Sequence, residues 1–166
     1  MPGTAALALE VIVLTNCRTS EAIEASWTEF DLDAALWTIP AGRMKAEKEH
    51  IIPLSDPAQA ALKLSRAAAG ESAFVFPGTK KGKPLSNMAC LALLKRMGHG
   101  DVTVHSFRSS FRDWAGESTS HAREVIEHAM SHQLKNKAEA AYARGTLLER
   151  RRLLMADWAA YCAQSA

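Results

Sequence analysis

Hydrophobic positions in the first part of the chain form one continuous run that a polar break separates from a second, shorter run. Residues 4–14 (TAALALEVIVL) have the composition of a buried helix, and Asn16 interrupts that helix before a second one begins. Thr19 or Ser20 can cap the second helix, because a hydroxyl oxygen accepts a hydrogen bond from the free N–H groups of a helix start. The pattern therefore predicts two helices with Arg18 at the start of the second.

Two short stretches rich in β-branched and aromatic residues follow. Residues 35–40 (ALWTIP) and 50–55 (HIIPLS) enclose a polar segment that contains Lys45 and Lys48. This composition predicts two strands of a small antiparallel sheet, with both lysines on or near the turn that joins them.

The rest of the chain is mostly helical in its pattern. Residues 74–77 (FVFP) are a further strand candidate, and residues 78–84 (GTKKGKP) form a basic, glycine-punctuated loop. The predicted helices are 55–68, which Gly70 ends, 86–98, 105–118, 121–130, 136–143 and 147–162. The predicted fold class is mainly α with a small antiparallel β-sheet (α+β).

Composition and charge narrow the class of protein only a little. A chain of 166 residues with 48% hydrophobic and 23% charged residues fits one globular domain without a membrane span. Three cysteines without metal-ligand spacing favour a reducing cytoplasm over a disulfide framework. Residues 1–94 carry nine basic and ten acidic side chains, whereas residues 95–152 carry eleven and seven, which permits a local basic surface.

Several polar residues are not required by helix packing. His105 and Arg108, in VTVHSFRSSFRDW, are three apart at a predicted helix start and project from one face. A lone pair with this spacing is usually structural, with the histidine capping the helix and the arginine solvated. His132 follows a later predicted helix, and Tyr142, one of two tyrosines, lies ten residues beyond it in an alanine-rich run.

Arg18 is placed where its charge opposes the positive end of the helix dipole. That placement costs stability unless a carboxylate such as Glu21, one turn away, or an anionic ligand offsets it. Two arginines, two histidines, a lysine and a tyrosine together suit the attack of a phenol on a phosphodiester without a metal. If these side chains perform that reaction, they must converge in one surface cleft around one phosphate.

The chemistry accounts for each residue type. Planar guanidinium groups match the non-bridging oxygens of a phosphoryl group and stay charged at any working pH, which suits Arg18 and Arg108. Tyr142 must lose its proton as it attacks, and His105 is the candidate base. The leaving 5′-oxygen needs a proton, and Lys45 is the candidate acid. No paired-carboxylate or HExxH metal motif is present, so arginines would supply the electrostatic stabilisation.

The segments TNCRTSE, RMKAEKEHIIPLS, HSFR and MSHQLKNKAEAAYAR, in this order, resemble the catalytic domain of the tyrosine recombinases, most closely that of the phage and genomic-island integrases. The resemblance extends from about Ala5 to Tyr161. It implies a set of catalytic residues and one supporting residue: Arg18, Lys45, His105, Arg108, His132 and Tyr142, with Glu21 supporting Arg18.

The resemblance also implies an activity and partners. Tyr142 would form a 3′-phosphotyrosyl bond with DNA and release a 5′-hydroxyl, which gives site-specific integration and excision of a mobile element without ATP, metal or another cofactor. The implied partners are double-stranded DNA attachment sites, other protomers in a tetramer on DNA, and accessory DNA-bending proteins; the isolated chain would be a monomer in the bacterial cytoplasm and act at the nucleoid. The last helix would either reach a neighbouring protomer or pack on its own chain.

Two departures from the family pattern affect these expectations. Cys17 stands where glycine usually precedes the first arginine, which would alter a tight turn. The N-terminal core-binding and arm-binding domains of such integrases have no counterpart here, so residues 1–166 are expected to be an excised or truncated catalytic domain with weak DNA binding and weak activity. The alternative functions are a topoisomerase-like relaxase and a non-catalytic DNA-binding or assembly module.

Overall fold

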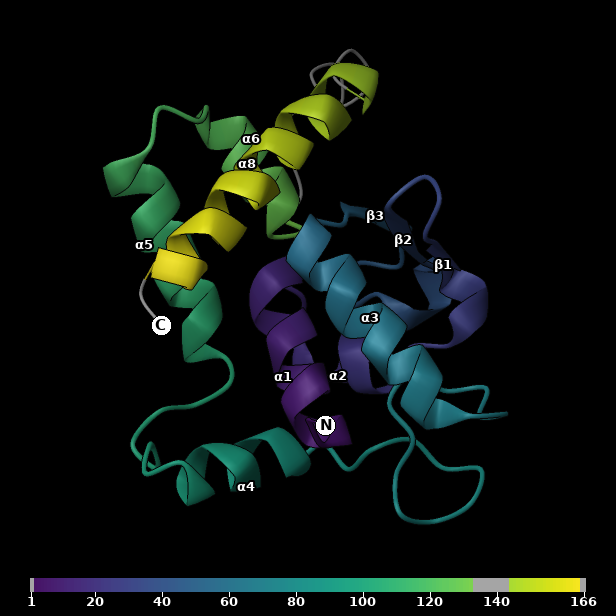
Figure 1. Cartoon of the computed structure of the whole chain (residues 1–166). Coiled ribbons are helices and arrows are strands. Elements are labelled where there is room, and N and C mark those ends of the chain that lie inside the picture. The colour runs from purple at the N-terminus through teal and green to yellow at the C-terminus, as the bar shows by residue number, and fades with distance from the viewer. Residues whose placement is uncertain (1, 133–143, 165–166) are drawn as a thin grey trace.

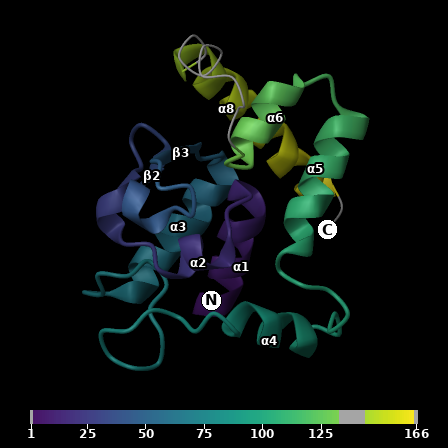
Figure 2. The ribbon, with the colours of Figure 1, turned by 180° about the vertical axis from the view of Figure 1, so that it is seen from behind.

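Helix α1 (Thr4–Thr15) lies at the centre of the molecule, between two groups of elements (Figures 1 and 2). The computed structural model describes residues 2–132 and 144–164. Because most positions of α1 are apolar, the helix is buried on several sides, against α3 (Asp56–Ala69), α4 (Ala89–Arg96) and α8 (Arg144–Gln164). The predicted first helix is confirmed.

The junction after α1 differs from its predicted capping. The helix ends at Asn16, which has a φ of 55°, and α2 (Thr19–Ile23) begins with Arg18 at its N-cap position. Neither predicted cap is correct, because both hydroxyl residues already lie inside the helix. The Glu21 carboxylate instead accepts a hydrogen bond from the backbone N–H of Arg18 at 2.8 Å.

The sheet is antiparallel in the order β1-β2-β3, with strands β1 (Phe30–Asp31), β2 (Leu36–Ile39) and β3 (His50–Pro53). The predicted pair of strands is confirmed, with Trp37 opposite Ile52. Trp37 is fully buried and stacks on Phe30 at 5.0 Å between ring centroids. Short 3₁₀ turns at Trp27–Glu29 and Ala41–Arg43 flank this sheet. The two-residue β1 was too short for a periodic signal.

The strand predicted at 74–77 is wrong. The segment makes only isolated bridges, from Phe74 to Ser26 and from Pro77 to Pro84. Proline has no N–H to donate to a ladder, so pairing cannot extend through Pro77. The apolar signal came instead from Val75 and Phe76, which are fully buried in the core around α1.

The C-terminal helices enclose a second hydrophobic cluster. Helices α5 (Ser106–Ser118) and α6 (Arg123–Ala129) pack with α8 around Phe111, Leu154 and Trp158. Figure 1 shows α8 running across α6 and α5, with its first turns on the side of β3 and its last turns beside α5. The Trp158 indole donates a hydrogen bond to the Val13 carbonyl of α1 at 2.7 Å, so α8 packs on its own chain.

The remaining helix predictions agree with the structure within a few residues, except that the predicted helix 136–143 falls entirely outside the described residues. Within the described part of the chain, no helix combines the length and apolar character that crossing a membrane requires. The predicted α+β class, mainly helical with a small antiparallel sheet, is confirmed.

Candidate active site

Arg18 is held at the start of α2 by the first carboxylate that follows it. Its guanidinium forms an ion pair with Glu21, with 2.8 Å between Nη1 and Oε1. The Glu21 side chain is only 4% exposed, whereas the Arg18 side chain is 31% exposed. Glu21 is therefore the partner that offsets the unfavourable position of Arg18 at a helix N-terminus, and the Arg18 side chain remains partly exposed to solvent.

Arg108 is buried where the two hydrophobic clusters meet. It is 5% exposed and donates hydrogen bonds to the carbonyl of Asn16, after α1, and to that of Met130, after α6, the latter at 2.8 Å. The alternative that it is solvated is wrong. Burial lowers the pKa of Arg108, and the nearby charge of Arg18 lowers it further. Two neighbouring guanidinium groups repel each other, so an anion bound between them would be stabilised by both.

His132 lies directly after α6 and is placed by its turn. Ser131 has a φ of 58°, and the backbone N–H of His132 donates to the Glu127 carbonyl at 3.0 Å. The His132 Nδ1 also lies 2.5 Å from the Glu127 carboxylate. Because Arg108 binds the Met130 carbonyl two residues earlier, α5 and the end of α6 bring Arg108 and His132 into one region.

His105 and Lys45 are exposed residues, at the start of α5 and in the hairpin of the sheet. His105 occupies the N-cap position of α5, one turn before Arg108, but its side chain makes no capping hydrogen bond. Lys45 lies in the hairpin between the second 3₁₀ turn and β3. Neither side chain has a hydrogen bond or ion pair with another described residue. Tyr142 lies outside the described residues.

A pair of histidines that sequence reasoning missed lies beside the arginines. His50 on β3 is 7% exposed, and its ring centroid is 6.4 Å from that of His128 on α6. Burial lowers the pKa of His50 to about 3, and the charges of Arg151, His128, Arg108 and Arg18 add to the effect in that order. The available signal was a polar side chain at a strand position that the pattern expects to be apolar.

His128 and its surroundings link the hairpin to α8. Burial lowers the pKa of His128 to about 4, and the charges of Arg151 and Lys48 lower it further. Lys48 is thus the hairpin lysine that interacts with this histidine. Arg151 of α8 is 3% exposed and donates to the Ile51 carbonyl of β3 at 2.5 Å.

In the tight turn before Arg18, the residue with a left-handed backbone conformation lies one position earlier than expected. Asn16, not Cys17, adopts the left-handed conformation, so a cysteine at position 17 does not alter that turn. Cys17 is 2% exposed, and burial raises the pKa of its thiol to about 12. The thiolate, which is the reactive form, is therefore absent at neutral pH, and Cys17 acts as a core residue.

The arginine pair, its supporting carboxylate and the nearby histidines form a site that suits an anionic phosphodiester, in a helical domain with a small sheet. A mainly helical domain with a small antiparallel sheet is consistent with the catalytic domain of a tyrosine recombinase. The chain belongs to the phage integrase family, which it matches over residues 2–147. The predicted family is confirmed.

The chain is similar to curated proteins that are considerably longer than it is. It is 40% identical to the prophage integrase IntA of Escherichia coli (strain K12), over 89% of this chain and 36% of that protein. It is 36% identical to the integrase of Enterobacteria phage P4, over 93% of this chain and 39% of that protein. It is 32% identical to the tyrosine recombinase XerC of Xanthomonas axonopodis pv. citri (strain 306), over 72% of this chain and 40% of that protein. The chain thus spans about two fifths of the length of these curated relatives.

Proposed function

We propose that this chain is the catalytic domain of a site-specific DNA recombinase that integrates and excises a mobile element. The observation that supports this most is the placement of Arg18 and Arg108, which lie 90 positions apart in the sequence and interact electrostatically beside a buried carboxylate, Glu21. Guanidinium groups arranged in this way fit the non-bridging oxygens of a scissile phosphate.

The proposed first reaction transfers a DNA strand to the enzyme. The Tyr142 oxygen attacks the scissile phosphorus, the bond from phosphorus to the 5′-oxygen breaks, and a 3′-phosphotyrosyl ester forms. His105 takes the phenol proton, and Lys45 gives a proton to the leaving 5′-oxygen. Arg18 and Arg108 stabilise the charge that develops on the non-bridging oxygens, and His132 donates a further hydrogen bond there.

The second reaction reverses the first with a different strand. A 5′-hydroxyl from a partner DNA attacks the phosphotyrosyl ester, the phosphorus forms a new bond to that oxygen, and Tyr142 regains its proton. The ester conserves the energy of the original bond, so the exchange requires neither ATP, a metal nor another cofactor. We propose that four protomers act together on paired DNA attachment sites in the bacterial cell, helped by DNA-bending proteins, and that the isolated chain is a monomer.

The chain covers about two fifths of the length of its curated relatives, and this affects how well it would bind DNA. We propose that DNA-binding segments like those of longer integrases complete the clamp around the attachment site. Binding by the catalytic domain alone would then be weak and strongly dependent on salt, because fewer phosphates are neutralised.

The experiment that tests the proposal captures the covalent intermediate. The chain is incubated with a pool of nicked duplexes whose sequence is randomised around the nick, so that a short 5′-hydroxyl fragment diffuses away after cleavage and traps the ester. DNA that remains attached to protein in detergent is then sequenced to find the preferred site. We expect a covalent species that Tyr142→Phe abolishes while DNA binding changes by less than about threefold, because one hydroxyl is a minor part of a charge-dominated interface.

Tyr161→Phe is the matched control. Tyr161 is stacked on Trp114 and Trp158, with ring centroids 5.3 and 5.7 Å away, as an aromatic packing residue would be. We expect this variant to form the covalent species normally. A covalent species that depends on Tyr161 instead would overturn the assignment of the nucleophile. Binding without any covalent species would favour a non-catalytic module, and efficient relaxation of supercoiled DNA without a preferred site would favour a relaxase.

A further inference from the structure

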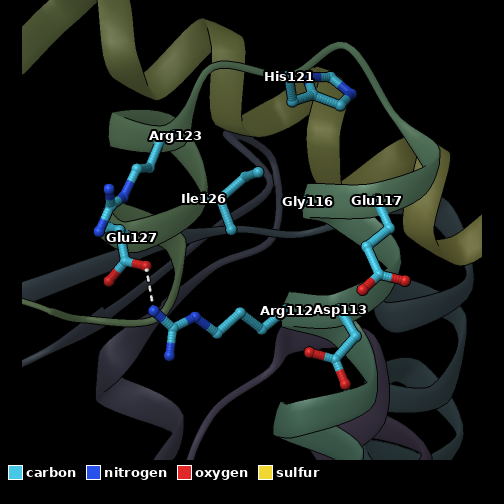
Figure 3. A pocket seen from close by; sticks show the side chains of 8 residues that line it. All are labelled: Arg112, Asp113, Gly116, Glu117, His121, Arg123, Ile126 and Glu127. Carbon is cyan, nitrogen blue, oxygen red and sulfur yellow. Dashed lines mark hydrogen bonds and ion pairs between the residues drawn. The ribbon is translucent and has the colours of Figure 1, made fainter.

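The carboxylate of Glu127 contacts one of the candidate catalytic histidines and an arginine of the neighbouring helix. Its Oε2 lies 2.5 Å from Nδ1 of His132. Its Oε1 accepts a hydrogen bond from Arg112 Nη2 at 3.1 Å, which Figure 3 marks with a dashed line. Sequence patterns gave no reason to single out either Glu127 or Arg112. Both line a pocket between α5 and α6, which leaves this contact open to solvent on one side.

We propose that Glu127 is a positioning residue for strand cleavage, which fixes the His132 ring so that Nε2 is the nitrogen available to a phosphate oxygen. This proposal rests on the proposed function. It assigns to Glu127 no contact with DNA, because its carboxylate is already occupied by His132 and Arg112.

The hydrogen-bond chemistry determines which ring nitrogen carries the proton. An ionised carboxylate can only accept hydrogen bonds, so Nδ1 of His132 must be the donor. Burial raises the pKa of Glu127, but the hydrogen bond from His132 and the charge of Arg112 outweigh it, and the net pKa lies below the ordinary value. Glu127 is therefore ionised at neutral pH. His132 is then either the neutral ring protonated on Nδ1 or the doubly protonated cation, and in both forms Nε2 points away from Glu127.

The backbone fixes the position of the same ring. His132 donates from its main-chain N–H to the Glu127 carbonyl at 3.0 Å, and Ser131 donates to the His128 carbonyl at 3.0 Å. With Ser131 at a φ of 58°, these two bonds form the reversal that ends α6. Glu127 thus holds His132 twice, once through the main chain and once through the side chain.

Helix α5 connects this arrangement to the arginine that would bind the phosphate. Arg108 and Arg112 are one turn apart on α5. Arg108 binds the Met130 carbonyl at 2.8 Å, and Arg112 binds the Glu127 carboxylate, so the same helix contacts the end of α6 at two points. A shift of α6 relative to α5 would move His132 and break both contacts. Arg112 is 52% exposed, so its own contribution is expected to be smaller than that of Glu127.

The test compares variants of Glu127 with a matched control elsewhere in the chain. Glu127→Ala removes the acceptor, and Glu127→Gln keeps a neutral acceptor of the same size. The control is Asp157→Ala, because Asp157 forms the same kind of contact with a different histidine, 2.6 Å from Nε2 of His121. Single-turnover cleavage is measured on the nicked duplex that traps the covalent intermediate, over a range of DNA concentrations.

We expect Glu127→Ala to lower the maximal cleavage rate by roughly 10- to 100-fold, as happens when carboxylates that orient functional histidines are removed elsewhere. The DNA concentration for half-maximal rate should change by less than about twofold, because Glu127 does not contact the substrate. Glu127→Gln should lie between the wild type and Glu127→Ala, and Asp157→Ala should cleave normally. Equal cleavage by Glu127→Ala and Asp157→Ala, or a loss that appears only in DNA affinity, would overturn the proposal.

A second readout is independent of catalysis. Nitrogen NMR of the free protein, with the His132 signals assigned from a His132→Gln variant, distinguishes a ring protonated on Nδ1 from one protonated on Nε2. We expect neutral His132 to be protonated on Nδ1 in the wild type and to shift toward Nε2 in Glu127→Ala. An unchanged Nδ1 signal would refute the positioning role. If the wild type itself fails to cleave any duplex, the proposed function fails, whereas the NMR result still decides whether Glu127 orients His132.

Discussion

His50 is a buried residue surrounded by cations, and this makes the stability of the fold depend on pH. Its pKa falls from an ordinary 6.5 to about 3, first through burial and then through Arg151 and His128. In the unfolded chain the same histidine binds a proton as the pH falls below about 6.5. Below about pH 6.5 the unfolded state therefore binds a proton that the folded state does not bind. The free energy of unfolding then falls as the pH is lowered from about 6.5 toward the pKa of His50 in the folded state.

We therefore expect the free energy of unfolding to be highest above pH 6.5 and to fall by about 2 kcal/mol between pH 7 and pH 5 through His50 alone. His128, whose pKa falls to about 4, acts in the same direction. Urea unfolding across this range measures the slope, and His50→Gln should reduce it. His99→Gln replaces an exposed histidine and is the control that should leave the slope unchanged. An equal slope in all three proteins would show that His50 is accessible to protons in the folded state.

The residues with a left-handed backbone conformation were the part of the site that was hardest to predict from the sequence. Asn16 and Ser131, with φ of 55° and 58°, lie directly before two of the candidate catalytic segments, those of Arg18 and His132. A glycine at either position would have marked the turn, because glycine adopts this conformation without a steric cost. The structure instead uses a polar residue with a Cβ, so the expected turn was placed at Cys17 rather than at Asn16.

Helix α8 is attached to the sheet by two consecutive arginines. Arg151 donates to the Ile51 carbonyl of β3 at 2.5 Å, and Arg152 donates to the carbonyls of Ala34 and Ala35 at 3.1 and 3.4 Å. Burial lowers the pKa of Arg151 to about 10, which still leaves it charged at neutral pH. The described part of α8 begins two residues after Tyr142, so these contacts fix the helix that follows the candidate nucleophile.

We expect Arg151→Ala to lower the free energy of unfolding by about 2 kcal/mol, because it leaves the partly buried Ile51 carbonyl without this donor and removes a packed aliphatic stem. Arg150→Ala is the matched control, since Arg150 is the exposed neighbour on the same helix, and its effect should stay within about 0.5 kcal/mol. Urea unfolding measures both. Equal stability of the two variants would mean that the hydrophobic face of α8, and not Arg151, holds the helix in place.

At the level of elements, sequence patterns predicted the long helices and the central strand pair, because these carry enough residues for a periodic signal. They failed where tertiary contacts decide the outcome. The segment 74–77 is apolar and largely buried like a strand, but Pro77 prevents continuous pairing. Arg18, His105 and Arg108 could be named as candidate site residues from their order and spacing. Glu127 and His50 could not, because what sets them apart is their contacts with other side chains in the folded protein.

Across the whole molecule, Arg108 joins the two hydrophobic clusters. One cluster surrounds α1, and the other lies between α5, α6 and α8. The guanidinium of Arg108 binds carbonyls at Asn16 and Met130, one on each side. A residue that supports both the fold and the proposed chemistry complicates a simple alanine test, because loss of cleavage can follow from loss of structure. Lys45, which is exposed, is free of this complication.

We accordingly expect Arg108→Ala to lower the free energy of unfolding by about 3 kcal/mol, since two buried acceptors lose a charged donor, while Lys45→Ala changes it by less than about 0.5 kcal/mol. Cleavage should fall in both, by roughly 10³-fold or more for Arg108→Ala and by roughly 10²- to 10⁴-fold for Lys45→Ala. Lys48→Ala, in the same hairpin, should have a much smaller effect on cleavage than Lys45→Ala.

Replacing the bridging 5′-oxygen of the scissile phosphate by sulfur separates the two roles. A thiolate leaves without being protonated, so the lost acid no longer matters, whereas the non-bridging oxygens are unchanged and still need the arginine. This substrate should restore cleavage by Lys45→Ala and leave Arg108→Ala defective, under conditions where urea unfolding shows both variants to be folded. Equal rescue of both would mean that Lys45 acts through its charge or position. Rescue of Lys48→Ala in place of Lys45→Ala would assign the acid to the lysine that interacts with His128.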